Sequence, residues 1–247
     1  MRITWLGHAA FRLKFGSSVV LIDPFLTGNP SFHGDPATAA AGATHVIVTH
    51  GHADHVGDAV AICQHGAKLV ANFELANMLT SLGTGQASSP DAEHDGFDSV
   101  GLNTGGAVDC GEFSVRLTPA LHSSGMQVGE GPELEMGLPN GVVITPKSDG
   151  EPVVYHMGDT DVFSDMALIG ELWQPDVVMV PIGDRFTMGA KAAALAMTRF
   201  LPKARVVLPC HWGTFPVLDA SPDAFIAEMG AQAARVKVPR VGEGFTV

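Results

Sequence analysis

The sequence predicts an α/β protein in which two β-sheets pack face to face with helices on the outside. Short apolar, β-branched runs typical of strands occur in two groups, and each group is followed by segments with helical periodicity. Histidine and aspartate residues, which commonly bind metals, also recur just beyond the ends of four predicted strands. These residues can converge only if the four strand ends lie along one edge of the fold. No linker is long or polar enough to divide the chain, so we expect one domain over residues 1–247.

The first group of predicted strands is separated by glycine-containing turns. These strands are expected at 2–6, 11–15, 18–23, a run ending at His50, and Lys68–Ala71. Helices are expected at Val56–His65 and Glu74–Leu82. Residues 27–43 are expected to form a loop, and residues 83–105 a loop or a weak hairpin.

The second group of predicted strands begins with a hairpin around Gly111. The strands are expected at Ala107–Cys110, Phe113–Pro119, Val142–Thr145, Val153–Met157, Val177–Pro181 and Arg205–Leu208, with Val236–Val238 and Phe245–Val247 closing an edge. Helices are expected at Ala190–Leu201 and Pro222–Ala234. Residues 123–141 are rich in Gly and Pro and are expected to form a mobile loop or a lid.

The composition narrows the class of partner. Of 247 residues, 14 are basic and 26 acidic, a net charge of −12, which argues against an electrostatic grip on nucleic acid or an anionic membrane. The start of the chain lacks the apolar core of a signal peptide, and no apolar run reaches membrane-spanning length. Three cysteines without a CxxC pair make a disulfide framework unexpected. We therefore expect a cytoplasmic protein that acts on a small molecule.

The stretch His50–His55 indicates a metal site. It holds three imidazoles and one carboxylate directly after a buried strand. A mixed His/Asp donor set suits zinc, manganese or iron. These side chains cannot all reach one ion from a straight strand, but a tight turn would send His50 and His52 to one ion and Asp54 and His55 to a second. We interpret the stretch as a two-metal site, because a merely polar turn rarely has this spacing.

These residues resemble the metallo-β-lactamase superfamily, and most closely its branch of small metal-dependent hydrolases related to the ascorbate-phosphate lactonases. The resemblance is carried by Ile3–Phe11, Leu21–Pro30, His50–Asp58, Tyr155–Thr160, Phe186–Gly189 and Pro209–Pro216. It implies a four-layer αββα sandwich with a dinuclear metal centre along one edge. Many relatives assemble, which is the basis for expecting a homo-oligomer.

The resemblance also assigns ligands by matching position. It implies that one ion is bound by His50, His52 and His122, that a second is bound by Asp54, His55 and His211, and that Asp159 bridges the two. The chain departs from the family pattern at Asp184, where relatives tend to have glycine, and in extra residues within 123–141. Both departures concern substrate preference and leave the ligand pattern intact.

Two ions about 3.5–4 Å apart can hold a bridging hydroxide that attacks a carbonyl or phosphoryl centre. Asp54 is expected to be the catalytic residue, because one of its oxygens can bind metal while the other orients the hydroxide and accepts its proton. Zinc is favoured, and manganese and iron remain open. The leaving group can take its proton from Asp54, from a nearby histidine or from water.

Three further residues are candidates for contact with substrate or ligands. His8 follows a strand end and is expected either to serve the site or to be a structural histidine. Asp23 is expected to orient a ligand imidazole, with a simple Asp-Pro turn as the alternative. Arg185 is expected either to bind an anionic substrate group or to be a surface charge.

The resulting hypothesis is a dinuclear metal-dependent hydrolase of a small ester-like bond, with a lactone favoured by analogy. A phosphodiesterase is the alternative enzyme, and a non-catalytic metal-binding module on the same fold is the alternative from another class.

Overall fold

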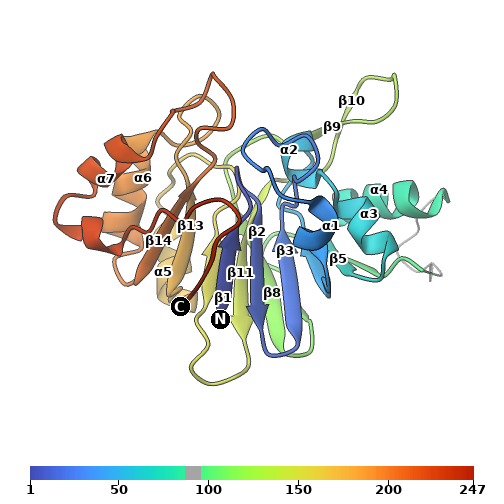
Figure 1. The fold of residues 1–247 in the computed structure, drawn as a ribbon, viewed down its shortest axis with the longest axis horizontal. Helices are drawn as coiled ribbons and strands as arrows, with labels where there is room; N and C mark the ends of the chain where they lie inside the picture. The colour runs from blue at the N-terminus through green and yellow to red at the C-terminus, as the bar shows by residue number, and fades with distance from the viewer. Residues whose placement is uncertain (87–95) are drawn as a thin grey trace.

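The computed structural model describes residues 1–86 and 96–247. Within them, two mixed β-sheets pack face to face, and helices cover the outer face of each sheet (Figure 1). The predicted four-layer sandwich is therefore confirmed. The part of the expected loop 83–105 that spans 87–95 lies outside the described residues. A single domain over 1–247 stays a prediction.

The first sheet has seven strands among the described residues, in the order β15-β1-β2-β3-β4-β5-β6. Their bounds are β1 Arg2–Trp5, β2 Phe11–Phe15, β3 Ser18–Ile22, β4 His45–Ile47, β5 Lys68–Asn72, β6 Ser99–Leu102 and β15 Gly244–Thr246. β2 runs antiparallel to both β1 and β3, while β3, β4, β5 and β6 are mutually parallel. β1, β3 and β4 therefore point in one direction.

The second sheet has six strands in the described part of the chain, in the order β14-β13-β12-β11-β8-β7. Their bounds are β7 Ala107–Asp109, β8 Phe113–Pro119, β11 Asn140–Pro146, β12 Val154–His156, β13 Val177–Pro181 and β14 Val206–Cys210. β11 is antiparallel to β8 and β12, while β12, β13 and β14 are parallel. β8, β12, β13 and β14 thus also share one direction.

The main core lies between the two sheets. Alternate residues of β8 (Phe113, Val115 and Leu117) are fully buried there, as the two-residue period of a strand requires. The Phe113 ring meets Phe15 of the opposite sheet edge-on, with centroids 5.4 Å apart. β3, β13 and β14 are buried on both faces, which explains why they are apolar apart from Ser18 at the start of β3.

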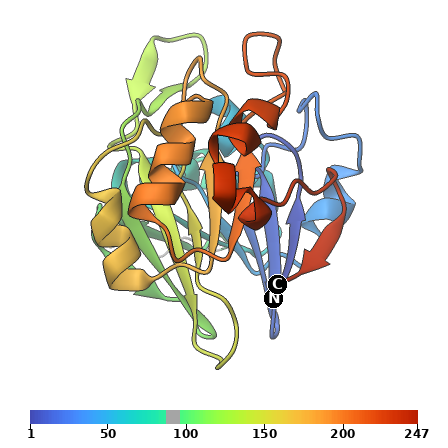
Figure 2. The same cartoon turned by 90° about the vertical axis from the view of Figure 1, so that its left-hand side faces the viewer.

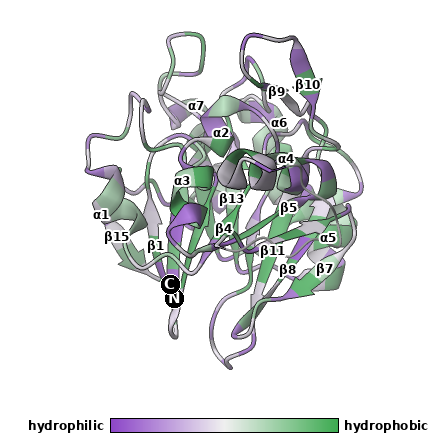
Figure 3. Ribbon diagram, turned by 90° about the vertical axis from the view of Figure 1, so that its right-hand side faces the viewer, coloured by the Kyte–Doolittle hydropathy of each residue, from purple (hydrophilic) through white to green (hydrophobic). Residues whose placement is uncertain are grey.

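Helices bury the outer faces of both sheets. The first sheet is covered by α1 Pro36–Ala40, α2 Ala53–Val56, α3 Ala59–Gln64 and α4 Phe73–Thr84, and the second by α5 Met166–Trp173, α6 Ala190–Leu195 and α7 Asp223–Glu228. Figure 2 faces the α5–α7 side, and Figure 3 faces the α1–α4 side, where the strands of the first sheet include many apolar residues. Among the described helices, none has the length and apolar character needed to cross a membrane.

Two predicted loops contain regular structure. Residues 27–43 include α1, because the Asp35 side chain accepts hydrogen bonds from the backbone N–H groups of Ala37 and Thr38 at the start of the helix. Residues 123–141 include an antiparallel hairpin of β9 Gly125–Gln127 and β10 Glu133–Glu135. Both predictions missed these elements, because short elements capped or paired locally leave little hydrophobic periodicity, and the lid stays a prediction.

Four other elements differ from expectation. Residues 99–102 form β6 at the edge of the first sheet, instead of belonging to a loop or weak hairpin, and α5 was not anticipated. The helix expected over Val56–His65 is divided at Gly57, whose φ is +42° and whose position leaves a side chain no room: a Cβ there would lie 2.5 Å from Phe25 Cα. The expected C-terminal helix changes to a 3-10 helix at Gly230.

Strand direction determines where the functional residues meet. The carboxyl ends of β1, β3 and β4 lie at one end of the first sheet, and those of β8, β12 and β14 lie at the adjacent end of the second sheet. Figure 1 shows α2, which follows β4, at the top of the molecule, and both chain termini at the bottom. The residues that follow these six strands therefore gather at the end of the sandwich opposite the termini.

Replacement of Phe113 by alanine tests the inter-sheet core. We expect Phe113→Ala to lower the free energy of unfolding by about 3–5 kcal/mol, because it opens a cavity between the sheets. Leu172→Ala is the control, since Leu172 is 64% exposed and its removal should change stability by less than about 0.5 kcal/mol. Urea denaturation measures both; similar values for the two variants would contradict the assigned core.

Candidate metal centre

Histidine and aspartate side chains converge at the shared edge. The described residues contain a three-histidine group and a mixed group, each with donor atoms within 4.8 Å of one another. The three-histidine group is His50, His52 and His122, and the mixed group is His8, Asp54, His55 and His211. Asp159 forms a further group with His50 and His55, so it lies where the two sets meet.

Asp159 is the centre of this arrangement. Its Oδ2 lies 2.9 Å from His211 Nε2, 3.3 Å from His55 Nε2 and 3.6 Å from His122 Nε2. Burial alone would raise the pKa of Asp159, but His211 and His55 hold it well below its usual range. Its Oδ1 and the Nε2 of His55 are buried without a hydrogen-bond partner. Buried polar atoms without a partner cost folding free energy. Both atoms are possible metal ligands, so a bound metal ion would remove this cost.

The three-histidine group is compact. His50 Nε2 lies 2.9 Å from His52 Nδ1, and the His122 ring packs edge-on against both other rings. Burial lowers the pKa of His50 well below 6.5, so the neutral imidazole that a metal requires is the stable form. Ser123 Oγ lies 3.2 Å from His52 Nε2. The other ring nitrogen of His52, Nδ1, therefore faces the other histidines of the group.

Asp23 orients two of the imidazoles. Its Oδ2 lies 2.7 Å from His55 Nδ1, so that nitrogen carries a proton and Nε2 faces the site. The same oxygen accepts a bond from the Thr49 hydroxyl at 2.8 Å, which leaves Thr49 Oγ1 to accept from His50 Nδ1 at 2.9 Å. Burial would lower the pKa of His55, but Asp159 and Asp23 outweigh it and raise the value, so without a metal ion Nε2 also carries a proton. A metal ion would displace that proton, and the lone pair of Nε2 would then face the site.

Asp54 is held by His8. His8 Nε2 lies 3.0 Å from Asp54 Oδ2, and burial lowers the pKa of His8 to about 4. Burial would raise the pKa of Asp54, but the hydrogen bond from His8 and the nearby His55 bring it below its usual range. The carboxylate is therefore ionised at neutral pH and can act as a ligand or as a proton acceptor.

The backbone is unusual at three of these positions. His8, Asp23 and His211 have φ values of 53°, 45° and 59°, a left-handed conformation that non-glycine residues rarely adopt. Strain of this kind persists only where the surrounding structure over-determines it, and it concentrates at functional sites. Close packing also requires Gly183, where a Cβ would lie 2.2 Å from the His211 carbonyl oxygen.

Arg185, a candidate from the sequence, and His156 lie outside the cluster. Arg185 is exposed on the loop after β13, with its guanidinium 6.0 Å from the Phe186 ring centre. His156 is buried behind the site: its Nε2 bonds the Ala9 carbonyl at 3.0 Å and its Nδ1 accepts from the Gly158 N–H at 3.0 Å. It stabilises the turn that presents Asp159.

Three hydroxyl residues that are not among the candidates from the sequence also contact the cluster. These are Thr49, Ser123 and Thr214, each within hydrogen-bond distance of a histidine ring nitrogen. Thr49 adjoins His50 in the chain, and Ser123 adjoins His122, so a hydroxyl next to a candidate ligand is a usable signal. Thr214 contacts His8 across 206 positions and has no such signal.

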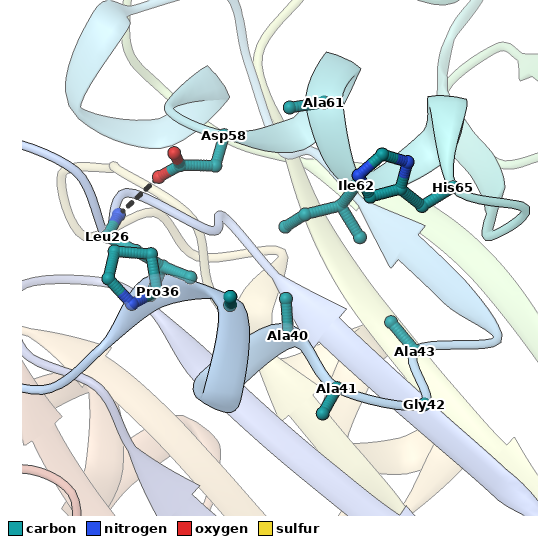
Figure 4. Close-up of a pocket in the computed structure, with 11 residues that line it drawn as sticks. Leu26, Pro36, Ala40, Ala41, Gly42, Ala43, Asp58, Ala61, Ile62 and His65 are labelled. Atoms are coloured by element: carbon teal, nitrogen blue, oxygen red, sulfur yellow. Dashed lines mark hydrogen bonds between the residues drawn. The ribbon is translucent and has the colours of Figure 1, made fainter.

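A separate apolar cavity of about 450 Å³ lies between α1 and α3 (Figure 4). Alanines of α1 face Ile62 across it, and Asp58 forms one end by accepting a bond from the Leu26 N–H. None of the clustered histidines or aspartates lines this cavity. It is therefore distinct from the candidate metal centre.

Comparison with known proteins identifies the family. The model of the β-lactamase superfamily domain matches residues 19–212. A UPF0173 metal-dependent hydrolase of Methylocella silvestris is 53% identical over 243 residues, covering 98% of each chain. The chain belongs to the β-lactamase superfamily. Among superfamily members it is a metal-dependent hydrolase of the UPF0173 type, which confirms the predicted hydrolase and argues against a non-catalytic module.

Two solved structures of similar proteins agree with the fold. The structure of Igni18, a metallo hydrolase from the archaeon Ignicoccus hospitalis, has 33% identity and a TM-score of 0.81, covering 100% of this chain and 98% of that one. An isothiocyanate hydrolase from Delia radicum gut bacteria has a TM-score of 0.73 at 20% identity, covering 100% and 99%; it shows the shared fold alone. In the present chain, Asp184 has a φ of 66°, a left-handed conformation. Glycine adopts this conformation readily, which is consistent with the glycine that the family resemblance leads us to expect at this position.

Replacement of Asp23 tests the orientation of the imidazoles. We expect Asp23→Asn to weaken zinc binding about 10–100-fold, because it loses the charge that fixes the His55 tautomer. Competition with a chromogenic chelator measures the affinity. Asp176→Asn is the matched control, since Asp176 accepts bonds from Val153 and Arg205 away from the site. Equal affinities for the wild type and Asp23→Asn would remove the orienting role.

Replacement of His156 tests the pH dependence of the fold. Burial lowers the pKa of His156 below 6.5, so at lower pH the unfolded chain takes up a proton that the folded chain does not. Folding stability from this residue is therefore retained above about pH 6.5 and lost as the pH falls. His156→Gln keeps one donor and one acceptor but cannot titrate. Urea denaturation of metal-free protein between about pH 7 and 5 should show a smaller loss for the variant; parallel curves would contradict this.

Proposed function

We propose that the chain is a dinuclear hydrolase of small ester-like substrates, with lactones favoured. The carrying observation is that two groups of donor atoms meet at one buried carboxylate, Asp159. In this proposal the three-histidine group holds one divalent ion. Asp54, His55 and His211 of the mixed group hold a second, and Asp159 lies between the ions.

The donor set supports zinc as the favoured ion, with manganese or iron as alternatives. All the donors are imidazole nitrogens or carboxylate oxygens, and the described residues bring no cysteine into the groups. Two divalent ions in such a site lower the pKa of water and polarise the bond under attack.

Within this proposal the chain's own residues have separate tasks. His55 and His50 present lone pairs because Asp23 and Thr49 hold their other ring nitrogens. Asp54 orients the attacking water and accepts its proton, since its carboxylate is ionised and its Oδ2 is held by His8.

The surroundings of the site support a weakly charged substrate. Leu121, Leu138, Phe186 and Val217 are each more than half exposed, and they lie on the loops that follow β8, precede β11 and follow β13 and β14. Exposed apolar side chains that cluster often mark a binding surface. Together with the net charge of −12, they favour a neutral lactone over a polyanion.

One observation favours phosphodiester hydrolysis as the second candidate. Arg185 is exposed on the loop after β13, in which Gly183 packs against His211, and no ion pair among the described residues includes its guanidinium. An unpaired guanidinium suits a phosphate group. Cytoplasmic location and homo-oligomer formation stay predictions that neither candidate depends on.

A substrate panel tests the proposed function. Zinc- or manganese-loaded protein is assayed on neutral lactones, phosphorylated lactones and phosphodiesters, beside chelated protein and Asp54→Asn. We expect lactone turnover that both controls abolish, with kcat for Asp54→Asn lower by about 10²–10⁴ because the general base is lost.

Arg185→Gln distinguishes the two substrate classes. Removal of the guanidinium should leave neutral lactone hydrolysis unchanged but raise KM for any phosphate-bearing substrate. Diester turnover without lactone turnover would overturn the favoured substrate. Wild-type protein with fewer than two bound ions would overturn the dinuclear centre.

A further inference from the structure

His8 contacts two segments of the candidate metal centre at once. Its ring is completely buried just beyond β1, with Nε2 3.0 Å from Asp54 Oδ2. Its backbone carbonyl accepts a hydrogen bond from the His211 N–H at 3.0 Å and another from Trp5 Nε1 at 2.9 Å. A single residue therefore ties the loop after β4 to the loop after β14, which belong to different sheets.

The hydrogen bonds around the His8 ring have a defined direction. An ionised carboxylate only accepts, so His8 Nε2 must carry the proton that bonds Asp54. In a neutral ring Nδ1 is then an acceptor, and its neighbour at 3.0 Å is the Thr214 hydroxyl, which must donate. Thr214 Oγ1 in turn accepts from Ser31 Oγ at 3.3 Å. The Thr214 hydroxyl has one proton to donate. We assign it to His8 Nδ1 at 3.0 Å and not to the Trp212 carbonyl oxygen, which lies farther away at 3.4 Å.

Both ring nitrogens of His8 are thereby engaged with protein atoms. The ring lies against His211, with centroids 3.9 Å apart, and edge-on to Phe25 and Phe215. These contacts exclude water from one side of Asp54 and leave His8 no lone pair to offer a metal ion. Although His8 lies within donor distance of Asp54, His55 and His211, its chemistry is that of a support.

We propose that His8 is a positioning residue that fixes the Asp54 carboxylate, and that the Thr214 hydroxyl sets the His8 tautomer required for this. The proposal rests on the proposed metal centre, in which Asp54 binds an ion and orients water. Held through Oδ2, the carboxylate cannot rotate away, so its geometry is set before an ion or substrate binds.

Two substitutions at His8 separate the hydrogen bond from ring packing. His8→Phe keeps an aromatic ring and removes the donor, whereas His8→Gln loses the ring and keeps an N–H that can reach Asp54. Thr214→Val and Thr214→Ser form a second pair, which removes or keeps the hydroxyl without altering His8. Thr44→Val is the matched control, because the Thr44 hydroxyl contacts His45 Nδ1 at 3.0 Å at the other end of β4.

The measurements are metal content, zinc affinity by chelator competition, the absorption spectrum of the cobalt(II)-loaded protein, and kcat and KM on whichever substrate the wild type hydrolyses. We expect His8→Phe to retain two ions per chain but to bind the weaker one about 10–100-fold less tightly. Its cobalt spectrum should change, and kcat should fall more than KM rises. His8→Gln should restore most of each value, and Thr214→Val should shift the spectrum in the same direction while Thr214→Ser and Thr44→Val do not.

Three outcomes would overturn the inference. Wild-type affinity and an unchanged spectrum in His8→Phe would show that the hydrogen bond does not position Asp54. Loss of one ion per chain in both His8 variants would make His8 a ligand. If His8→Phe does not fold by circular dichroism, equal spectra for Thr214→Val and Thr214→Ser would overturn the proposal. Failure of the proposed function gives a different result, because the wild type itself would then bind fewer than two ions. In that case the cobalt(II) spectrum of the one bound ion would be compared between the wild type and the His8 variants.

Discussion

The placement of one buried carboxylate among several imidazoles is the constraint that organises this molecule. Asp159 can stay ionised in the interior only because His55, His122 and His211 lie within 3.6 Å of its Oδ2. Those residues come from both sheets, so the sheets must pack with the carboxyl ends of β4, β8, β12 and β14 at one edge. The long inter-sheet core supplies the burial that holds this arrangement together.

Two residues, Asp23 and His8, hold the side chains of the cluster in place through hydrogen bonds. Asp23 acts on the imidazoles of the β4 loop, and His8 acts on Asp54 and on the backbone of His211. Both supports adopt a left-handed backbone, a cost that the tightly packed strands around them offset. Such rigidity suits a site whose chemistry depends on donor atoms being in place before substrate arrives.

A fold by itself does not name a substrate. Exposed side chains around the candidate metal centre lie on the loops that follow β8, β13 and β14 and on the segment before β11. The proposed substrate class rests on exposed apolar side chains such as Phe186 and Val217, on the exposed guanidinium of Arg185 and on the net charge of −12. The β9–β10 hairpin, expected from the sequence as a loop or lid, lies in the segment between His122 and β11.

The sequence by itself determined the features whose cause is local or periodic. The spacing within 50–55 indicated metal binding, and apolar runs located the strands of both sheets except the edge strand β6. Only the tertiary structure decided how residues far apart in the chain face one another. Thr214 and His8 are 206 positions apart, and their contact depends on strand direction and sheet packing, which no local pattern encodes. The same holds for α1 and β6, short elements stabilised by a cap or by a neighbouring strand and not by periodicity.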